Sequence, residues 1–308
     1  MAPSILITES IHEDALDLLR AGGCIVRMAP CGEVMTPADA LLIRTQPLGE
    51  AEAALFGLIS KHGVGVDNIP LDAVREAGGW VMNTPGANSA AVSEQALMLM
   101  LALARNLRGQ ELAQREGRDP PRSPGLEGRR LLVVGFGGSG QRLALLGQTL
   151  GMKVRVLSRR TDPAAKAGFA VATDPDEAMA EADIVSLHCP LTDATRNFLS
   201  AERLALLPKG AFVVNCARGG LIDEVALAEN LRSGHLGGAG LDVTLTEPLP
   251  SSHPLHGAPR LILTPHAAAM SEGAFRRMGM MAAQNILDHF AGCPDPSHVV
   301  LSGRPTHP

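Results

Sequence analysis

Apolar and polar positions along the first third of the chain follow the pattern of short strands separated by helices. Apolar runs bounded by turn residues predict strands at 5–7, 24–28, 40–43, 58–60 and 80–82. Apolar residues at helical spacing predict helices at 11–19 and 71–77. Because strands that alternate with helices are typical of a parallel α/β layer, we expect one here.

The same pattern resumes after a long helix and a polar segment. The helix is predicted at 89–106, and the segment 109–128, rich in proline, glycine and arginine, is expected to be a linker. Further strands are predicted at 131–134, 152–157, 184–187, 212–214, 240–243 and 261–263. Further helices are predicted at 200–206, 224–232 and 271–290.

The last predicted helix follows the last strand of the second set. We expect this helix to return and pack on the first layer, which makes the first domain discontinuous in sequence. The predicted domains are therefore residues 1–104 with 270–308, and residues 105–269.

Composition narrows the class of protein. The chain has 308 residues and a net charge of −5, which argues against nucleic acid as a partner. The longest apolar run, at 96–104, is less than half of what a bilayer crossing needs, so we expect no membrane association. Five cysteines, at 24, 31, 189, 216 and 293, show no metal-ligand spacing. Their odd, sparse count fits a reducing compartment, and we expect a cytoplasmic protein without a metal.

A glycine-rich turn follows the predicted strand at 131–134. Its glycines, Gly135, Gly137 and Gly140, have the spacing of the dinucleotide-binding fingerprint. The first glycine makes the tight turn, the second lets the backbone approach a pyrophosphate, and the third lets helix and strand pack closely. The next helix would present its free N–H groups to the phosphates.

The end of the next predicted strand distinguishes two forms of the cofactor. An NAD site favours a carboxylate there, about 20 residues past the fingerprint, to bind the ribose hydroxyls. This chain has Ser158, Arg159 and Arg160 instead. A hydroxyl and guanidinium groups suit a 2′-phosphate, so the sequence predicts NADP, with NAD as the alternative. The alternative interpretation is that Arg159 and Arg160 are solvated surface residues without a role in binding the cofactor.

With these residues in place, the chain resembles the D-isomer-specific 2-hydroxyacid dehydrogenases. The matching blocks are KHGVGVDN (61–68), NTPG (83–86), VSE (92–94), HCPLT (188–192), NCARG (215–219), LDV (241–243), EP (247–248) and TPH (264–266). The resemblance implies two doubly wound parallel-sheet domains, a flavodoxin-like substrate domain and a Rossmann dinucleotide-binding domain, with the active site in the cleft between them. It also implies a homodimer.

Reducing a 2-oxo acid needs a cation for the carboxylate, a proton donor at the carbonyl oxygen and a hydride donor. Arg218 follows a predicted strand at its carboxyl end and could fork onto carboxylate and carbonyl oxygens. His266 follows another and could exchange the proton. Glu247 would hold its ring in one tautomer. We rank His62, His188, His235 and His289 lower, because no matching carboxylate block accompanies them.

The resemblance also implies groups that bind substrate and cofactor. The backbone N–H groups of Val64 and Gly65 would hold the substrate carboxylate, and Arg44 is a further substrate-binding candidate. The cofactor-binding candidates are Gly135, Gly137, Gly138, Ser139, Gly140, Ser158, Arg159, Arg160, His188, Cys189, Pro190, Cys216, Ala217, Asp242, His266 and Ala268. Asp242 could instead cap a turn, and Cys216 is expected to pack as a small hydrophobe rather than act as a nucleophile.

Two departures from the family pattern affect these expectations. Gly138 and Ser139 stand where the family usually has arginine and an apolar residue, so we expect a looser turn and an altered affinity for the cofactor. The region between Arg44 and Lys61 looks shorter than usual, which makes substrate identity less transferable than the chemistry.

The leading hypothesis is an NADPH-dependent reductase of glyoxylate or hydroxypyruvate that forms D-2-hydroxy acids. One alternative is a phosphoglycerate dehydrogenase, in which Arg44 and Lys61 would contact a phosphate. The other is a non-catalytic protein of the same fold that senses NADP(H) and binds partners. A sensor needs none of Arg218, Glu247 and His266, so their joint presence favours an enzyme.

Overall fold

The computed structural model describes residues 2–29, 33 and 35–304, so Cys31 lies outside the described residues. Contacts along the chain divide it into two compact units, residues 1–88 with 270–308, and residues 89–269. The domain boundary predicted from the sequence lies after residue 104, beyond the long helix α4 (Ser89–Ala104), which here belongs to the second unit.

The first unit is built on a six-stranded sheet in the order β13-β5-β4-β3-β1-β2. Its strands are β1 (Ser4–Ile7), β2 (Ile25–Met28), β3 (Ala38–Ile43), β4 (Phe56–Lys61), β5 (Trp80–Met82) and β13 (Val299–Leu301). All neighbours are parallel except β13, which joins β5 antiparallel at the edge. An antiparallel edge strand is common on such sheets.

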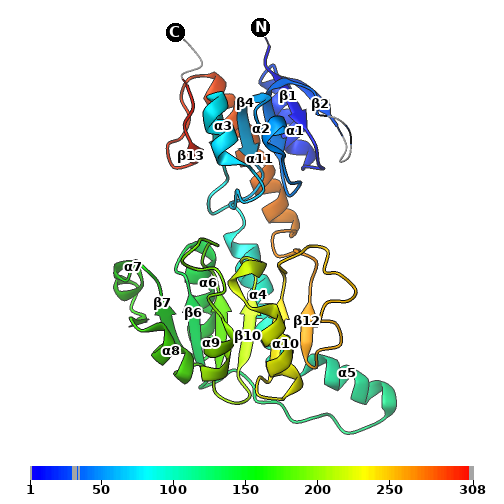
Figure 1. Ribbon diagram of the computed structural model, residues 1–308, viewed down its shortest axis with the longest axis vertical. Coiled ribbons are helices and arrows are strands. Elements are labelled where there is room, and N and C mark those ends of the chain that lie inside the picture. The colour runs from blue at the N-terminus through cyan, green and yellow to red at the C-terminus, as the bar shows by residue number, and fades with distance from the viewer. Residues whose placement is uncertain (1, 30–32, 34, 305–308) are drawn as a thin grey trace. The chain divides into compact units, whose positions relative to one another are not determined.

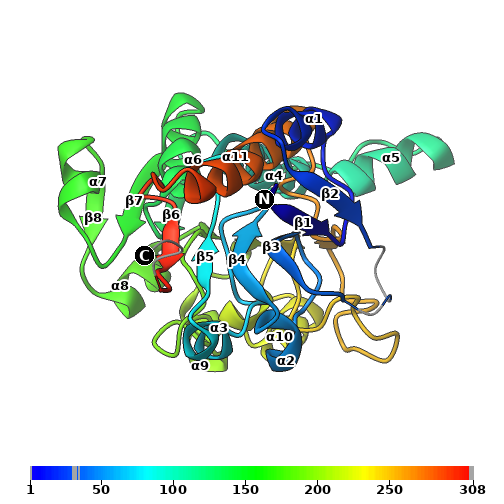
Figure 2. The ribbon, with the colours of Figure 1, turned by 90° about the horizontal axis from the view of Figure 1, so that it is seen from above.

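Helices cover both faces of this sheet, as Figure 2 shows. One face carries α1 (Glu13–Ala21) and α11 (Glu272–Phe290), and the other carries α2 (Glu50–Ala53) and α3 (Leu71–Ala77). Successive side chains of a strand point to opposite faces. Ile5 accordingly packs with the α1 and α11 cluster, and Leu6 packs with the α2 and α3 cluster. Helix α11 thus packs on the first layer, as the sequence predicts.

The second unit is built on a seven-stranded parallel sheet in the order β12-β11-β10-β9-β6-β7-β8 (Figure 1). Its strands are β6 (Arg130–Val134), β7 (Lys153–Leu157), β8 (Ala170–Ala172), β9 (Ile184–Leu187), β10 (Phe212–Asn215), β11 (Gly238–Leu241) and β12 (Leu261–Leu263). One face packs against α4 and α6 (Gly138–Thr149). The other packs against α8 (Pro175–Glu181), α9 (Ala201–Leu206) and α10 (Glu224–Arg232). The predicted fold class, two doubly wound α/β domains, is confirmed.

The prediction of a linker at 109–128 is wrong in its first half. Helix α5 (Leu107–Glu116) occupies that part and ends at Gly117, whose φ of 64° is left-handed. Leucine, glutamine, glutamate and arginine favour the helix strongly enough to tolerate Gly109. The turn-forming residues that suggested a linker lie mainly after residue 116, where the chain is irregular as far as 129. The short α7 (Asp162–Lys166) is also absent from the predicted elements.

Candidate active site

The predicted site residues of the second unit follow the carboxyl ends of six strands. The glycine turn comes after β6, Ser158 after β7, His188 after β9, Cys216 to Arg218 after β10, Asp242 after β11 and His266 after β12. Carboxyl ends of parallel strands meet at one edge of the sheet, and ligands of open α/β sheets bind there. The chain order reverses between β6 and β9, which is the switch point where dinucleotides bind in such folds.

The glycine turn has the geometry that a dinucleotide needs. Gly135 has a φ of 100°, and a Cβ on it would lie 2.5 Å from the carbonyl oxygen of His188. A Cβ on Gly140 would overlap the carbonyl of Gly135. A Cβ on Gly137, the N-cap of α6, would meet nothing within 4 Å. The turn is therefore tightly packed on its inner side and open at the start of the helix.

Gly138 has a structural reason that the sequence did not reveal. A Cβ at this position would overlap Oγ of Ser89, the first residue of α4, and would come within 3.1 Å of its Cβ. The residue therefore permits the close approach of α4 to the start of α6. The packing requirement stands beside the expectation that Gly138 loosens the turn, which stays a prediction.

His188 joins the glycine turn to the sheet. Its Nδ1 lies 3.1 Å from Oγ of Ser139, and its Nε2 lies 2.9 Å from Oγ of the buried Ser186. Desolvation lowers the pKa of His188 to about 4, so the ring is neutral at physiological pH. Ser139 thus provides a hydroxyl contact that the usual apolar residue of the family pattern would lack.

The end of β7 presents cationic side chains without local partners. Within the described residues, no hydrogen bond or ion pair engages the side chains of Ser158, Arg159 or Arg160, and both arginines are exposed. Arg155, on the strand itself, pairs instead with Glu177 and Glu181. Arg159 lies close enough to Cys189 for its charge to oppose the burial that raises the pKa of this thiol to about 11.

His266 and Glu247 form the carboxylate–imidazole pair that the sequence predicts. Nδ1 of His266 lies 2.7 Å from Oε2 of Glu247, and both side chains are partly exposed. Burial acts to raise the pKa of Glu247, but the hydrogen bond to His266 and the positive charges of His266 and Arg218 outweigh it, so the pKa lies below its usual value. Glu247 is therefore ionised at neutral pH. It holds the His266 ring through Nδ1, which leaves Nε2 on the side of the ring away from Glu247.

Asp242 supports the loop that carries His266. Its buried carboxylate accepts hydrogen bonds from the backbone N–H groups of Ala267 and Ala268, at 2.9 and 2.8 Å, and from Oγ1 of Thr264 at 2.5 Å. The N–H of His266 donates to the Asp242 carbonyl at 2.8 Å. The turn-capping role considered from the sequence is thus present, and Ala268 lies buried in the same loop.

Arg218 completes the group on the turn after β10. The Asn215 side chain fixes this turn by donating to the Arg218 carbonyl at 2.8 Å and accepting from the Ala217 N–H at 2.9 Å. Nη1 of Arg218 donates to the Ala217 carbonyl at 2.7 Å. Cys216 is buried, and burial strongly raises the pKa of its thiol, as expected of a packed small hydrophobe. The positive charge of Arg218 contributes to the lowered pKa of Glu247, so the two side chains interact electrostatically.

The substrate-binding candidates of the first unit lie after β3 and β4. Within the described residues the backbone N–H groups of Val64 and Gly65 donate no hydrogen bond, and Val64 is exposed. Arg44 stacks over the Phe275 ring at 5.1 Å from its centroid, and Nη1 donates to the Ser10 carbonyl at 3.3 Å. The buried Lys61 donates to the Arg44 carbonyl and Asn68.

The remaining histidines are less suited to proton transfer. Desolvation lowers the pKa of the buried His62 to about 4, and its Nε2 contacts the Phe275 carbonyl at 3.2 Å. His289 is buried against Trp80. Sequence reasoning missed the contact between the partly buried His253 and the buried Glu224, whose Nε2 and Oε2 lie 3.3 Å apart. The pattern around Glu224 reads as an ordinary helix start and gave no signal of it.

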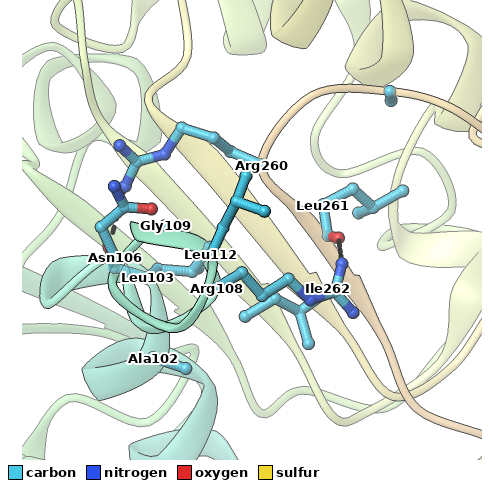
Figure 3. A pocket seen from close by; sticks show the side chains of 10 residues that line it. Ala102, Leu103, Asn106, Arg108, Gly109, Leu112, Arg260, Leu261 and Ile262 are labelled. Atoms are coloured by element: carbon cyan, nitrogen blue, oxygen red, sulfur yellow. Dashed lines mark hydrogen bonds between the residues drawn. The ribbon is translucent and has the colours of Figure 1, made fainter. Parts of the chain in front are cut away.

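A pocket of about 270 Å³ lies elsewhere in the second unit, between α4, α5 and β12 (Figure 3). Arg108 and Arg260 extend into it, and they donate to the carbonyls of Leu261 and Leu103, each at 2.8 Å. None of the predicted site residues lines this pocket.

Within the described part of the chain, no three histidine, cysteine or acidic side chains gather as metal ligands would, and no helix has the length and apolarity to cross a bilayer.

Comparison with known proteins assigns the chain to a family. Residues 97–268 match the family profile described as the NAD-binding domain of the D-isomer specific 2-hydroxyacid dehydrogenases. The chain belongs to this family. A D-3-phosphoglycerate dehydrogenase of Methanocaldococcus jannaschii is 37% identical over 297 residues, covering 92% of this chain and 56% of that relative. The chain thus spans a little over half the length of this relative.

Other proteins are similar to this chain along most of their length. A hydroxypyruvate reductase of Thermotoga maritima is 35% identical over 267 residues, covering 82% of this chain and 85% of the reductase. The crystal structure of the TT0316 protein of Thermus thermophilus superposes with a TM-score of 0.85 at 34% identity, covering 97% of this chain and all of that one. The named relatives of the D-isomer specific 2-hydroxyacid dehydrogenase family thus differ in substrate.

The family indicates a nicotinamide dinucleotide cofactor, and the residues present fit one. Gly137, the N-cap of α6, has open space where a side chain would begin, and the N-terminus of a helix favours a pyrophosphate. The ends of β7 and β9 provide further polar groups at the same edge of the sheet. The fit rests on this open turn rather than on the family description alone.

Proposed function

We propose that this member of the family transfers a hydride between NADP(H) and a small 2-oxo or D-2-hydroxy acid, most directly in the reduction of glyoxylate or hydroxypyruvate. The observation that carries the proposal is the 2.7 Å contact between His266 and Glu247, with Arg218 near enough to lower the pKa of that carboxyl. Such a group suits acid–base work on a carbonyl beside a carboxylate.

Each residue has a distinct part in the proposed reaction. His266 donates a proton from Nε2 to the carbonyl oxygen during reduction and recovers one during oxidation. Glu247 accepts from Nδ1 and stabilises the ring when it is positively charged. Arg218 binds the carboxylate and polarises the carbonyl. The nicotinamide supplies or accepts the hydride when bound. The N–H groups of Val64 and Gly65 are the proposed carboxylate donors, with Arg44 as a further contact.

The preference for NADP rests on the end of β7. The chain has no acid there to bind ribose hydroxyls, and Arg159 and Arg160 have no local partner within the described residues. A 2′-phosphate would provide a negative charge for these arginines. An acidic side chain at the end of β7 would instead repel the 2′-phosphate. The side chain of Ser158 would donate to the same phosphate.

A second candidate is the oxidation of a phosphorylated 2-hydroxy acid. Several of the similar proteins are named D-3-phosphoglycerate dehydrogenase. Arg44 and Lys61 lie at neighbouring strand ends. Arg44 would provide a cation for a phosphate, whereas the buried Lys61 would first have to release its contacts with the Arg44 carbonyl and Asn68. A sensor without turnover is less consistent with the Glu247–His266 geometry.

The proposal includes a homodimer formed by the second unit. Helices α4 and α5 carry exposed apolar side chains, and α5 extends away from the sheet (Figure 1). These side chains are Met98, Leu101, Leu107 and Leu112. Exposed apolar residues gathered on adjacent helices are typical of a protein interface. Light scattering tests this part of the proposal, since a Leu107→Glu, Leu112→Glu variant should be monomeric if the wild-type protein is a dimer.

A matched panel of assays tests the activity. NADPH and NADH oxidation would be followed with glyoxylate, hydroxypyruvate and pyruvate, and coenzyme reduction with 3-phosphoglycerate. The proposal expects turnover with NADPH and at least one small 2-oxo acid, giving the D-product where the product is chiral. Turnover only with phosphoglycerate would favour the second candidate. A folded protein that binds coenzyme but converts none of these acids would contradict both.

A further inference from the structure

The segment 243–248, between β11 and Pro248, carries Glu247 to its contact with His266. Apolar burial does not anchor its middle, because the Leu245 side chain is 66% exposed. Within the segment, Oγ1 of Thr244 donates to the Thr246 carbonyl at 2.9 Å. The position of Glu247 therefore depends on polar contacts made by the backbone of the segment.

Two successive amides of this segment donate to two different carboxylates. The N–H of Thr244 donates to Oε1 of Glu247 at 3.1 Å, and the N–H of Leu245 donates to Oε1 of Glu224 at 2.6 Å. The two amide nitrogens are joined through one Cα and one planar peptide group, so the bond that holds the Leu245 N–H limits how far the Thr244 N–H can move. Glu224 thus fixes the backbone whose Thr244 N–H donates to the Glu247 carboxylate.

The Glu224 carboxylate is itself confined. It lies at the first turn of α10 and is 6% exposed. Its Oε2 makes no hydrogen bond within the described residues, but it lies 3.3 Å from Nε2 of His253, as an ion pair would. Nδ1 of His253 accepts from the Leu255 N–H at 3.3 Å, which orients the ring. The charged groups that face Glu224 are His253 and Glu247. Burial raises the pKa of Glu224, Leu245 and His253 oppose the rise, and the charge of Glu247 adds to it.

Packing restricts the segment from a second direction. A Cβ on Gly219, which begins the short 3₁₀ turn Gly219–Leu221, would overlap the backbone of Thr244. The same turn directly follows Arg218. The backbone at Thr244 and Leu245 is therefore held between Gly219 and Glu224.

We propose that Glu224 is a positioning residue for the Glu247–His266 pair, acting through the Leu245 N–H. The proposal rests on the proposed function only in taking that pair as the acid–base group. Its essential feature is the reach of the Glu224 side-chain oxygen, because the Leu245 amide is the point of contact. Charge alone would not place Glu247.

Two substitutions separate reach from charge. Glu224→Gln keeps an oxygen at the same distance for the Leu245 N–H, whereas Glu224→Asp keeps the charge but withdraws the carboxylate by one methylene. Glu229→Gln, at an exposed position of the same helix, is the matched control. Thermal unfolding would establish that each variant is folded.

The activity-independent measurement is the nitrogen chemical shift of His266 Nδ1, read through the carbon-bound ring protons of isotope-labelled protein and assigned with His266→Gln. We expect Glu224→Asp to move this shift toward that of an imidazole without the carboxylate contact, while Glu224→Gln and the control leave it near the wild-type value. In turnover assays Glu224→Asp should lower kcat about tenfold or more, with coenzyme affinity changed less than about threefold.

The proposal is overturned if Glu224→Asp leaves the His266 shift unchanged, or if Glu224→Gln and Glu224→Asp move it equally. A shift in the Glu229→Gln control would also overturn it, because general damage to α10 would then be the cause. If wild-type protein converts no 2-oxo acid, the proposed function fails, but the chemical-shift comparison still decides the role of Glu224.

Discussion

Single side chains at the strand ends account for most of the proposed chemistry. Both carboxylate oxygens of Glu247 have partners: Oε2 contacts His266, and Oε1 accepts from the backbone N–H of Thr244. The Glu247 carboxylate therefore has little freedom to turn. Arg159 shows the opposite situation, with no partner within the described residues. A carboxylate whose oxygens both have partners, as in Glu247, suits a residue that orients an imidazole ring. A guanidinium without a partner within the described residues, as in Arg159, suits a residue that binds an anionic ligand.

The role of Arg159 predicts the effect of reversing its charge. Arg159→Asp should lower kcat/KM for NADPH about 10- to 100-fold, because a charge-assisted contact to the 2′-phosphate is lost and a repulsion gained. The value for NADH should change much less. Arg155→Gln is the matched control, since Arg155 is paired with Glu177 and Glu181. An unchanged preference for NADPH in Arg159→Asp would contradict the coenzyme assignment.

Helices and strands place these side chains, and their contacts explain one departure from the family pattern. Gly138 at the start of α6 lies against Ser89 at the start of α4. A side chain at 138 would push apart two helices that pack on the same face of the sheet. The closeness of these helices is a steric reason for glycine at this position.

This contact predicts a compensating pair of substitutions. Gly138→Ala should destabilise the protein by about 1–3 kcal/mol, as overpacking of a tight contact usually does. Ser89→Gly in the same chain should recover most of that loss, because it removes the atoms that a new Cβ would meet. Chemical denaturation of the single and double variants measures the coupling. Strictly additive effects would show that Ser89 does not restrict position 138.

The sequence predicts strands and the glycine turn well because their signals are local. Apolar runs identify β6 and β9, and the spacing of Gly135, Gly137 and Gly140 identifies the turn. The amide of Leu245 bonding to Glu224 has no local signal, since it joins residues 21 positions apart. Helix α5 was missed because turn residues that follow it dominate the composition of the segment.

At the scale of the whole molecule, each unit contains a neutral histidine, His62 buried in the first unit and His188 half-buried in the second. The folded pKa of His62 and of His188 is about 4, below the ordinary value of 6.5, and desolvation is the main cause in both. The unfolded chain therefore binds more protons between these values. Stability that is fully present above pH 6.5 is lost as pH falls toward 4.

This difference predicts a pH dependence of unfolding. Each histidine should contribute a loss of up to about 3 kcal/mol between pH 6.5 and 4, since one pKa unit corresponds to about 1.4 kcal/mol. His62→Gln and His188→Gln should each flatten the dependence in this window, whatever their effect at pH 7. Denaturant unfolding of wild type and variants at several pH values measures the slopes. Parallel slopes in all three proteins would contradict the assignment of neutral, desolvated rings.

The most direct test of the central claim is the effect of His266→Asn on turnover compared with coenzyme binding. If His266 transfers the proton, kcat for the preferred 2-oxo acid should fall by about 10²–10⁴-fold. The dissociation constant of NADPH, measured by fluorescence, should change by less than about tenfold, because the glycine turn and the end of β7 are intact. Losses of equal size in kcat and in coenzyme affinity would contradict the account.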